Sequence, residues 1–358
     1  MHRLIAVIAA CSVSLTTFAV EDIVLPSGFS IEEYADVPNA RSLALGANGT
    51  VFASNRSGRG VFAVVSEGGV TRTITLDDDL QTPNGIAFHE GDLYVAEIDR
   101  VYRYDDIESN LDNVPDPVVL NIDLPSEEWH GWRYIGFGPD NKLYISIGAP
   151  CNICEEPGYA QIIRMNADGS ERETYATGIR NSVGLTWHPE TKELWFTDNG
   201  RDMLGDDLPP GELNNVDAKG QNFGFPYCHA GELLDPMFGQ EKDCSDYRAP
   251  VQKLDSHVAP LGLTFYSGDM FPSEYRGQVF IAEHGSWNRS KKIGYRISLV
   301  RFQEGVPVSY ERFATGWLQN ESVSGRPVDL VVLEDGSMLV SDDHAGKIYR
   351  ISYTSVSI

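Results

Sequence analysis

The stretch that decides the fold is Trp129-His130-Gly131-Trp132-Arg133-Tyr134-Ile135-Gly136-Phe137-Gly138-Pro139-Asp140-Asn141-Lys142-Leu143-Tyr144-Ile145-Ser146-Ile147-Gly148. Its second half is typical of a β-hairpin, with a short apolar strand, a Pro-Asp-Asn-Lys turn and an alternating strand that returns. Its first half places a histidine, two tryptophans and an arginine directly before that hairpin. The stretch therefore combines a structural unit with a group of side chains that suits a binding or catalytic site.

The hairpin pattern occurs six times along the chain. Each copy has a small apolar strand, a turn, and a second strand that ends in small or acidic residues. The first strands are 42–45, 84–88, 134–137, 183–187, 261–265 and 328–332. The second strands are 51–54, 93–97, 143–146, 194–198, 279–283 and 338–342, and a third strand follows most copies.

Six copies with three to four strands each predict an all-β fold, a six-bladed β-propeller. A β-sandwich would not explain six near-equal copies. Residues 29–35, which precede the first copy, are expected to supply an outer strand that closes the ring. Long inserted loops on the channel face are predicted at 105–130, 199–260 and 284–327.

Three polar residues each lie a few positions before the first strand of a copy: His130, Arg180 and Arg326. In a propeller the first strands lie nearest the central axis, and the loops that enter them open on one face. We therefore expect these residues, which belong to different blades, to meet at the mouth of the channel.

The formal net charge of -24 argues against nucleic acid as a partner, because a phosphate backbone requires a basic surface. Residues 1–19 resemble a signal peptide cleaved after Ala19, which predicts a periplasmic or secreted protein. Ile8-Ala9-Ala10-Cys11 also resembles a lipoprotein box, although the apolar core before Cys11 is short. We find no other segment of roughly 20 apolar residues that would span a membrane. Residues 20–358 are predicted to form one propeller domain, because no linker-like segment divides them.

Four cysteines follow the predicted cleavage site, and an even number in an exported chain indicates disulfides. Proximity in the sequence favours Cys151–Cys154 and Cys228–Cys244. The alternative, half a zinc site or a redox motif at Cys151-Asn152-Ile153-Cys154, lacks a second Cys-x-x-Cys.

His130 is the best candidate for a general base, and the alternative is an ordinary surface histidine. Arg180, followed by Asn181, offers a planar fork for a carboxylate or quinone oxygen, or else forms a structural salt bridge. The oxygen-rich loop 198–207 suits a hard cation such as calcium, although many acidic loops bind nothing. Trp129, Trp132 and Trp287 could hold a planar cofactor, stack on a sugar, or simply pack in the core.

At these residues the chain resembles the soluble quinoprotein sugar dehydrogenases, most closely the L-sorbosone dehydrogenase-like branch. The ordered set of matching stretches covers essentially the whole mature chain: 129–134, 148–154, 178–185, 197–202, 205–210, 225–228, 284–290 and 325–328. The resemblance implies a six-bladed propeller with pyrroloquinoline quinone (PQQ) near the central axis and calcium beside the quinone.

The resemblance also assigns roles to individual residues. His130 would be the base that takes a proton from the sugar hydroxyl while hydride moves to the quinone. Arg180, Asn181 and Arg326 match cofactor contacts, and Arg133, His284 and Arg289 are further cofactor candidates. Backbone carbonyls of Gly200 and Arg201, together with Asp202, would hold calcium.

Two positions depart from the family pattern. Ala149 stands where glucose-type relatives carry an aspartate that orients the base, so either Glu155 or Glu156 replaces that aspartate or the base is less strongly tuned. Gly211 stands where relatives often carry an acid, which leaves the metal affinity open.

The predicted function is PQQ- and calcium-dependent oxidation of a small sugar or sugar aldehyde. Because the chain has no Cys-x-x-Cys-His haem motif, the electrons would pass to an external acceptor, a quinone or a cytochrome. The alternatives are a calcium-dependent lactonase or esterase on the same fold, or a non-enzymatic carbohydrate-binding propeller.

Overall fold

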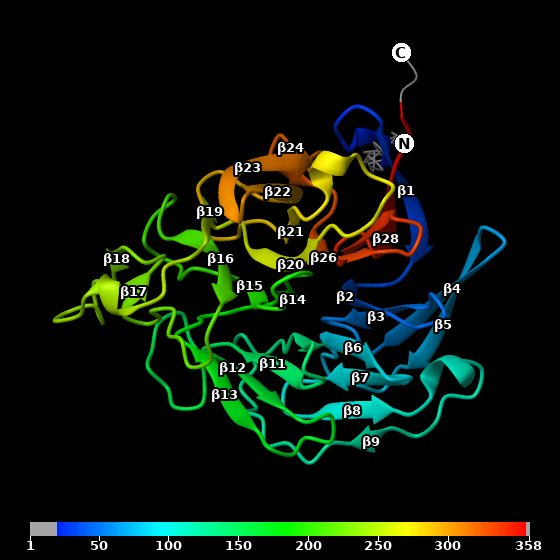
Figure 1. Ribbon diagram of the computed structural model, residues 1–358, viewed down its shortest axis with the longest axis horizontal. Coiled ribbons are helices and arrows are strands. Elements are labelled where there is room, and N and C mark those ends of the chain that lie inside the picture. Colours follow the sequence, from blue (N-terminus) through cyan, green and yellow to red (C-terminus); the bar gives the residue numbers. More distant parts are fainter. Residues whose placement is uncertain (1–19, 356–358) are drawn as a thin grey trace, which may run out of the picture.

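The computed structural model describes residues 20–355. The predicted signal peptide, its cleavage site after Ala19 and the alternative anchor at Cys11 lie outside the described residues and stay predictions. Six four-stranded antiparallel sheets are arranged as blades around a central axis (Figure 1). The prediction of an all-β, six-bladed propeller is confirmed.

The first three blades, from the innermost to the outermost strand, are β2 (Ala40–Leu45), β3 (Val51–Asn55), β4 (Val61–Glu67) and β5 (Val70–Asp77); β6 (Gly85–His89), β7 (Asp92–Ala96), β8 (Val101–Tyr104) and β9 (Val118–Val119); and β10 (Ile135–Phe137), β11 (Leu143–Ile147), β12 (Gln161–Met165) and β13 (Glu173–Thr177). The last three are β14 (Leu185–Trp187), β15 (Leu194–Asp198), β16 (Pro210–Val216) and β19 (Gln252–Ser256); β20 (Pro260–Phe265), β21 (Val279–Glu283), β22 (Arg296–Gln303) and β23 (Val306–Ala314); and β26 (Pro327–Val332), β27 (Met338–Asp342), β28 (Lys347–Tyr353) and β1 (Phe29–Asp36). The loops hold the hairpins β17 (Cys228–His229) with β18 (Leu233–Leu234) and β24 (Leu318–Gln319) with β25 (Ser322–Val323), and the 3-10 helices η1 (Val20–Asp22), η2 (Ile107–Ser109), η3 (Cys244–Asp246) and η4 (Ser273–Tyr275).

The ring closes in the last blade, as the sequence predicts. Strand β1 pairs antiparallel with β28, so the N-terminal segment completes the sheet that the C-terminal residues begin. This pairing covers one edge of β28 and joins the two ends of the described chain (Figure 1). Each innermost strand also contacts the innermost strands of the two adjacent blades.

The three predicted insertions all contain blade strands: 105–130 contains β9, and 284–327 contains β22 and β23. The predicted insertion 199–260 is likewise wrong in its extent. It contains β16 and β19, the third and fourth strands of the fourth blade. Strand β16 has the sequence Pro-Gly-Glu-Leu-Asn-Asn-Val, which is poor in β-branched and aromatic residues. Pairing with β15 and β19, and not local propensity, makes this segment a strand.

The core consists of apolar layers between adjacent blades. The layer between the first two blades contains Phe52 and Ala63 from one blade and Ile86, Leu93 and Tyr104 from the other. Near the axis the blades approach so closely that a side chain does not fit. A Cβ atom added at Gly184 would lie 2.1 Å from the Leu261 carbonyl oxygen of the next blade. Among residues 20–355, no helix is both long and apolar enough to cross a bilayer.

The structure contains the disulfides Cys151–Cys154 and Cys228–Cys244, the pairing that sequence proximity favours. The second bridge joins the β17–β18 hairpin to η3, 16 positions further along the chain.

We expect Cys228→Ala/Cys244→Ala to lower the free energy of unfolding by about 3 kcal/mol. A disulfide lowers the entropy of the unfolded chain, and the effect is larger when the loop that it closes is longer. Opening Cys151–Cys154 should cost about half as much. Denaturant unfolding of the two double variants checks this, and equal losses would contradict it.

Candidate active site

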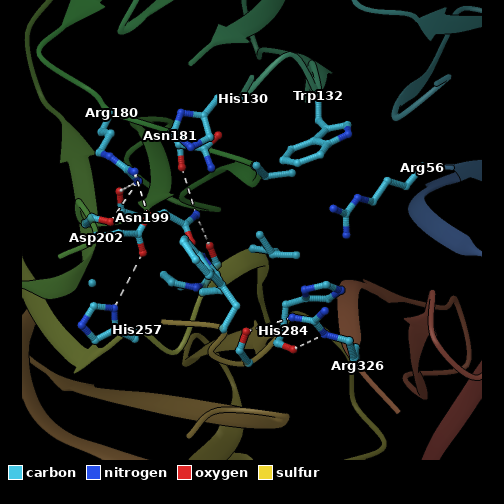
Figure 2. Close-up of a pocket in the computed structure, with 18 of the residues that line it drawn as sticks. Arg56, His130, Trp132, Arg180, Asn181, Asn199, Asp202, His257, His284 and Arg326 are labelled. Carbon is cyan, nitrogen blue, oxygen red and sulfur yellow. Dashed lines mark hydrogen bonds and ion pairs between the residues drawn. The ribbon is translucent and has the colours of Figure 1, made fainter. Parts of the chain in front are cut away.

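A cavity of about 580 Å³ lies at the mouth of the central channel. It is lined by the loops that enter the innermost strands and by the loops that leave the second strands. Its polar and aromatic lining residues are Arg41, Arg56, Glu128, Trp129, His130, Trp132, Arg180, Asn181, Asn199, Asp202, His257, His284, Trp287 and Arg326. His130, Arg180 and Arg326 do converge on one cavity (Figure 2).

The acidic ends of the second strands position the cavity loops. Asp198, at the end of β15, accepts the backbone N–H groups of Arg180 at 2.9 Å and Asn181 at 2.6 Å. Asp342, at the end of β27, accepts the backbone N–H of Arg326 at 2.9 Å. In the fourth and sixth blades, the acidic residue at the end of the second strand therefore holds the loop that enters the innermost strand of the same blade.

His130 lies just before β10, is 9% exposed, and has a left-handed backbone with φ of 53°. Its Nδ1 lies 2.8 Å from the carbonyl oxygen of Ala149, and the indole Nε1 of Trp129 lies 3.2 Å from its Nε2. A carbonyl only accepts and an indole N–H only donates, so Nδ1 carries the proton and Nε2 carries the lone pair. Burial, reinforced by the charge of Arg180, lowers the pKa of His130 to about 3. His130 is therefore a neutral imidazole whose basic nitrogen is Nε2.

His130 is oriented by the hydrogen bond that its Nδ1–H donates to a backbone carbonyl. The Ala149 carbonyl takes the place expected for a carboxylate, whereas the side chains of Glu155 and Glu156 are exposed. The N–H of Ala149 in turn donates to the carbonyl of Arg180 at 2.8 Å. The backbone of one residue, Ala149, thus links the loop of His130 to the loop of the buried Arg180.

We expect His130 to stay neutral throughout the range from pH 5 to 8. Its pKa lies below the ordinary value of 6.5, so below pH 6.5 the unfolded chain binds more protons at this residue than the folded chain. The contribution of His130 to stability is therefore present above pH 6.5 and is lost as the pH falls toward 3. Nitrogen-15 NMR titration, with His130→Asn to assign the ring signals, measures this; a midpoint near pH 6 would contradict it.

Arg180 is buried and uses its guanidinium within the protein. Nη1 donates to the carbonyls of Asn199 at 3.1 Å and Gly200 at 2.9 Å. Nε donates to the Asn152 carbonyl, and Nη2 donates to the Asn152 side chain, both at 2.9 Å. Nη2 also forms an ion pair with Asp202 at 3.2 Å. Because Asn152 lies inside the Cys151–Cys154 loop, that disulfide helps to hold Arg180 in place.

Asn181 lies next to Arg180 on the cavity wall. Its side-chain oxygen Oδ1 is buried and has no hydrogen-bond partner within residues 20–355. Buried polar atoms are normally paired, so this oxygen is available to a hydrogen-bond donor on a bound molecule.

Arg41, Arg56, Arg326 and His284 form the opposite wall, which we call the basic wall (Figure 2 labels the last three). Arg41 Nη1 pairs with Asp343 at 2.8 Å, and His284 Nε2 lies 2.8 Å from the other oxygen of the same carboxylate. Burial opposes ionisation of Asp343, but hydrogen bonding from His284 and the charge of Arg41 bring its pKa below the ordinary value. Arg326 donates through Nε and Nη2 to the carbonyls of His284 and Gly285, both at 2.9 Å.

Arg56 differs from the other members of the basic wall. Its guanidinium lies 4.4 Å from the centre of the Trp132 ring, and it makes no hydrogen bond or ion pair within the described part of the chain. Sequence reasoning missed Arg56, Arg41 and Asp343. The register of the repeat could have found the first two, because Arg41 precedes the first predicted strand 42–45 as Arg326 precedes 328–332, and Arg56 follows a second strand.

Three of the predicted site residues do not line the cavity. Arg133 is 1% exposed and supports the base loop, donating to the carbonyls of Ile98 at 2.8 Å and Pro125 at 2.6 Å. Arg289 pairs with Asp207 at 3.1 Å, and the side chain of Arg201 pairs with the buried Asp235 at 2.5 Å.

Gly200 and Asp202, two of the predicted calcium ligands, do line the cavity. Within residues 20–355, no cluster of three or more His, Cys, Asp or Glu side chains is arranged to hold a metal ion. A calcium ion at this site would therefore depend on backbone carbonyls and on oxygens from a bound molecule.

The sequence profile of the family described as Glucose / Sorbosone dehydrogenase matches residues 110–286, which include His130 and Arg180. An uncharacterised protein of Borreliella burgdorferi is 33% identical over 96% of this chain and 95% of its own length. The chain belongs to the glucose/sorbosone dehydrogenase family. A second profile, described as TrAA12-like, matches residues 232–354.

Two further comparisons concern pyranose dehydrogenases. The pyrroloquinoline quinone-dependent pyranose dehydrogenase of Coprinopsis cinerea is 25% identical over 72% of this chain and 34% of its own length. The holo form of the PQQ domain of a pyranose dehydrogenase from the same organism superposes with a TM-score of 0.80, covering 92% of this chain and 97% of that domain. At 20% identity this likeness shows the fold alone. The matches place the chain in the glucose/sorbosone dehydrogenase family, and its assignment to the sorbosone branch stays a prediction.

Proposed function

We propose that this protein is a PQQ-dependent dehydrogenase that oxidises a hydroxyl-bearing sugar, with His130 as the general base. The observation that carries this proposal is a neutral histidine, with its lone pair on Nε2, on one side of a cavity and a basic wall on the other. Family membership supports the same chemistry.

The residues of the cavity suit PQQ, a planar tricarboxylate. Arg56 has no other polar partner among the described residues, and Arg41 and Arg326 keep guanidinium N–H groups beyond those used within the protein. Arginines bind carboxylates through paired, charge-assisted hydrogen bonds, so the basic wall would hold the cofactor carboxylates. Asn181 would accept from a donor on the cofactor through its free Oδ1. When bound, PQQ would supply the two-electron acceptor for a hydride from the sugar.

The protein's own residues would move the proton. The Nε2 lone pair of His130 would take the proton of the substrate hydroxyl as the C–O bond becomes C=O and the carbon loses hydride. The Ala149 carbonyl, which already accepts from Nδ1, would stabilise the imidazolium that forms. Because a carbonyl carries no full charge, it stabilises this cation less than the carboxylate of glucose-type relatives would. Arg180 would keep the base and the Asn199–Gly200 carbonyls in fixed relative positions.

We propose that calcium binds at the Gly200 and Arg201 carbonyls and the Asp202 carboxylate, weakly in the apoprotein and more tightly when PQQ is bound. The chain offers about three oxygens there, whereas calcium takes six to eight. Arg180 already donates to Gly200 O and pairs with Asp202, which weakens the attraction for a second cation. We expect a Kd for calcium of about 1 mM or weaker without PQQ, and at least tenfold tighter binding with it. Calorimetry in both conditions measures this, and tight binding to the apoprotein would contradict it.

The same proposal has four further parts. The substrate is a sugar or sugar aldehyde, and the chain belongs to the sorbosone branch of the family. An external quinone or cytochrome accepts the electrons, and the protein is exported to the periplasm or the medium. A lactonase would instead need carboxylates that converge on a metal. Among the described residues, the acidic side chains that line the cavity are Glu128 and Asp202, and Asp202 is paired with Arg180.

The deciding experiment is a titration of the purified mature apoprotein with PQQ, with and without calcium, followed by absorbance. Aldoses and sorbosone are then tested for reduction of the bound quinone or of a dye. Saturable binding with sugar-driven reduction, lost in His130→Ala, would establish the function. Absence of binding at micromolar PQQ would overturn it and direct attention to hydrolysis of lactones. Sugar binding that neither needs PQQ nor depends on His130 would indicate a carbohydrate-binding propeller.

A further inference from the structure

The nitrogen that must receive the substrate proton already has a partner in this structure. Trp129 directs its indole N–H to His130 Nε2 at 3.2 Å, with the two rings nearly perpendicular at 83°. The neutral imidazole has one lone pair, and this contact uses it. A substrate hydroxyl and the Trp129 N–H therefore compete for the same acceptor.

Trp129 can leave this position without movement of the backbone around it. The side chain of Trp129 is 55% exposed, and its contact with His130 is its one hydrogen bond among the described residues. The loop itself is held by the buried Arg133, which donates to the carbonyls of Ile98 and Pro125, and by the hydrogen bond from Gly131 N to Glu128 O at 3.0 Å. Rotation of the indole about its own side-chain bonds is enough to uncover Nε2.

We propose that Trp129 is a specificity-determining residue that guards His130 Nε2 and is displaced by the substrate. This inference rests on the proposed dehydrogenase function. The group that replaces the indole N–H must itself be a hydrogen-bond donor. An alcohol, a cyclic hemiacetal or a hydrated aldehyde provides an O–H donor, whereas a free aldehyde carbonyl does not. Trp129 thus selects the hydroxyl form of a sugar, and it covers the base while no substrate is bound.

The contact can be tested in the apoprotein, without cofactor or sugar. Trp129→Phe keeps an aromatic ring but removes the N–H donor. A donor on Nε2 favours the neutral imidazole, so its loss raises the proton affinity of His130 about threefold to tenfold. Nitrogen-15 NMR of the ring should show a changed Nε2 shift and a higher titration midpoint. The matched control is Trp287→Phe, because Trp287 lines the same cavity, is 69% exposed and makes no hydrogen bond with His130.

The second readout is the separation of KM from kcat in the protein loaded with PQQ and calcium. Without the competing N–H, Trp129→Phe should lower the KM for an aldose by about threefold to tenfold and leave kcat within about twofold. A residue that only stacks on the sugar would leave KM unchanged in the phenylalanine variant.

Identical His130 signals in Trp129→Phe and wild-type protein would overturn the proposal, as would an unchanged or raised KM. Because the NMR arm uses no PQQ, a failure of the dehydrogenase function would not affect it. The two failures can therefore be told apart. Equal thermal unfolding midpoints of the variants and the wild type would show that the comparison is between folded proteins.

Discussion

We expect His130→Asn to lower kcat by about 10²- to 10⁴-fold, the usual contribution of a positioned general base, which is the role we propose for His130, while the Kd for PQQ changes little. Asparagine is similar in size to part of the imidazole but cannot accept a proton at neutral pH. His130 also lies across the cavity from the basic wall that would hold the cofactor carboxylates (Figure 2). The measurement is steady-state kinetics with a saturating aldose, alongside an absorbance titration of PQQ.

The matched control for this prediction is His344→Asn, because His344 lies outside the cavity lining. Its kcat should equal that of the wild-type protein. Retention of more than a tenth of the wild-type kcat by His130→Asn would show that another group accepts the proton.

We expect Arg56→Ala and Arg326→Ala each to weaken PQQ binding by about tenfold to a hundredfold, because each would remove the charge-assisted hydrogen bonds that we propose to the cofactor carboxylates. Arg56→Ala is the cleaner test. Its guanidinium contacts the Trp132 ring but makes no hydrogen bond or ion pair among the described residues. Removing Arg56 therefore leaves no polar group of these residues without its partner. Arg326→Ala also removes the contacts to the carbonyls of His284 and Gly285, and Arg326→Lys separates the loss of charge from the loss of the planar fork.

Arg289→Ala is the control for the basic wall. Arg289 is a cation removed from the cavity and paired with Asp207, so its loss changes the net charge equally but should leave the Kd for PQQ within about twofold. Equal losses of affinity in Arg289→Ala and Arg56→Ala would mean that overall charge, and not the basic wall, attracts the cofactor.

Much of the fold can be predicted from the sequence, because the patterns that determine it are local. Alternation of apolar residues, hairpin turns such as Pro139-Asp140-Asn141-Lys142, and their sixfold recurrence define the blades without reference to distant residues. The fourth blade is the exception, since β16 has little intrinsic strand propensity and needs its neighbours β15 and β19 to form. The convergence of His130, Arg180 and Arg326 was also predictable, because a repeat in known register places equivalent loops on one face.

By itself the sequence determined the number of blades, the closure of the ring by the N-terminal strand and the loops that build the cavity, because these follow from short-range patterns and their repetition. Only the tertiary structure decided which partners the site residues have. Asp343 binds both Arg41, 302 positions away, and His284, 59 positions away, and no local pattern encodes these contacts. Likewise, the group that orients His130 is the carbonyl of Ala149, and the donor to its Nε2 is the indole N–H of Trp129. Every residue has a backbone carbonyl, so residue type does not reveal which one is used; that depends on how the folded chain is packed.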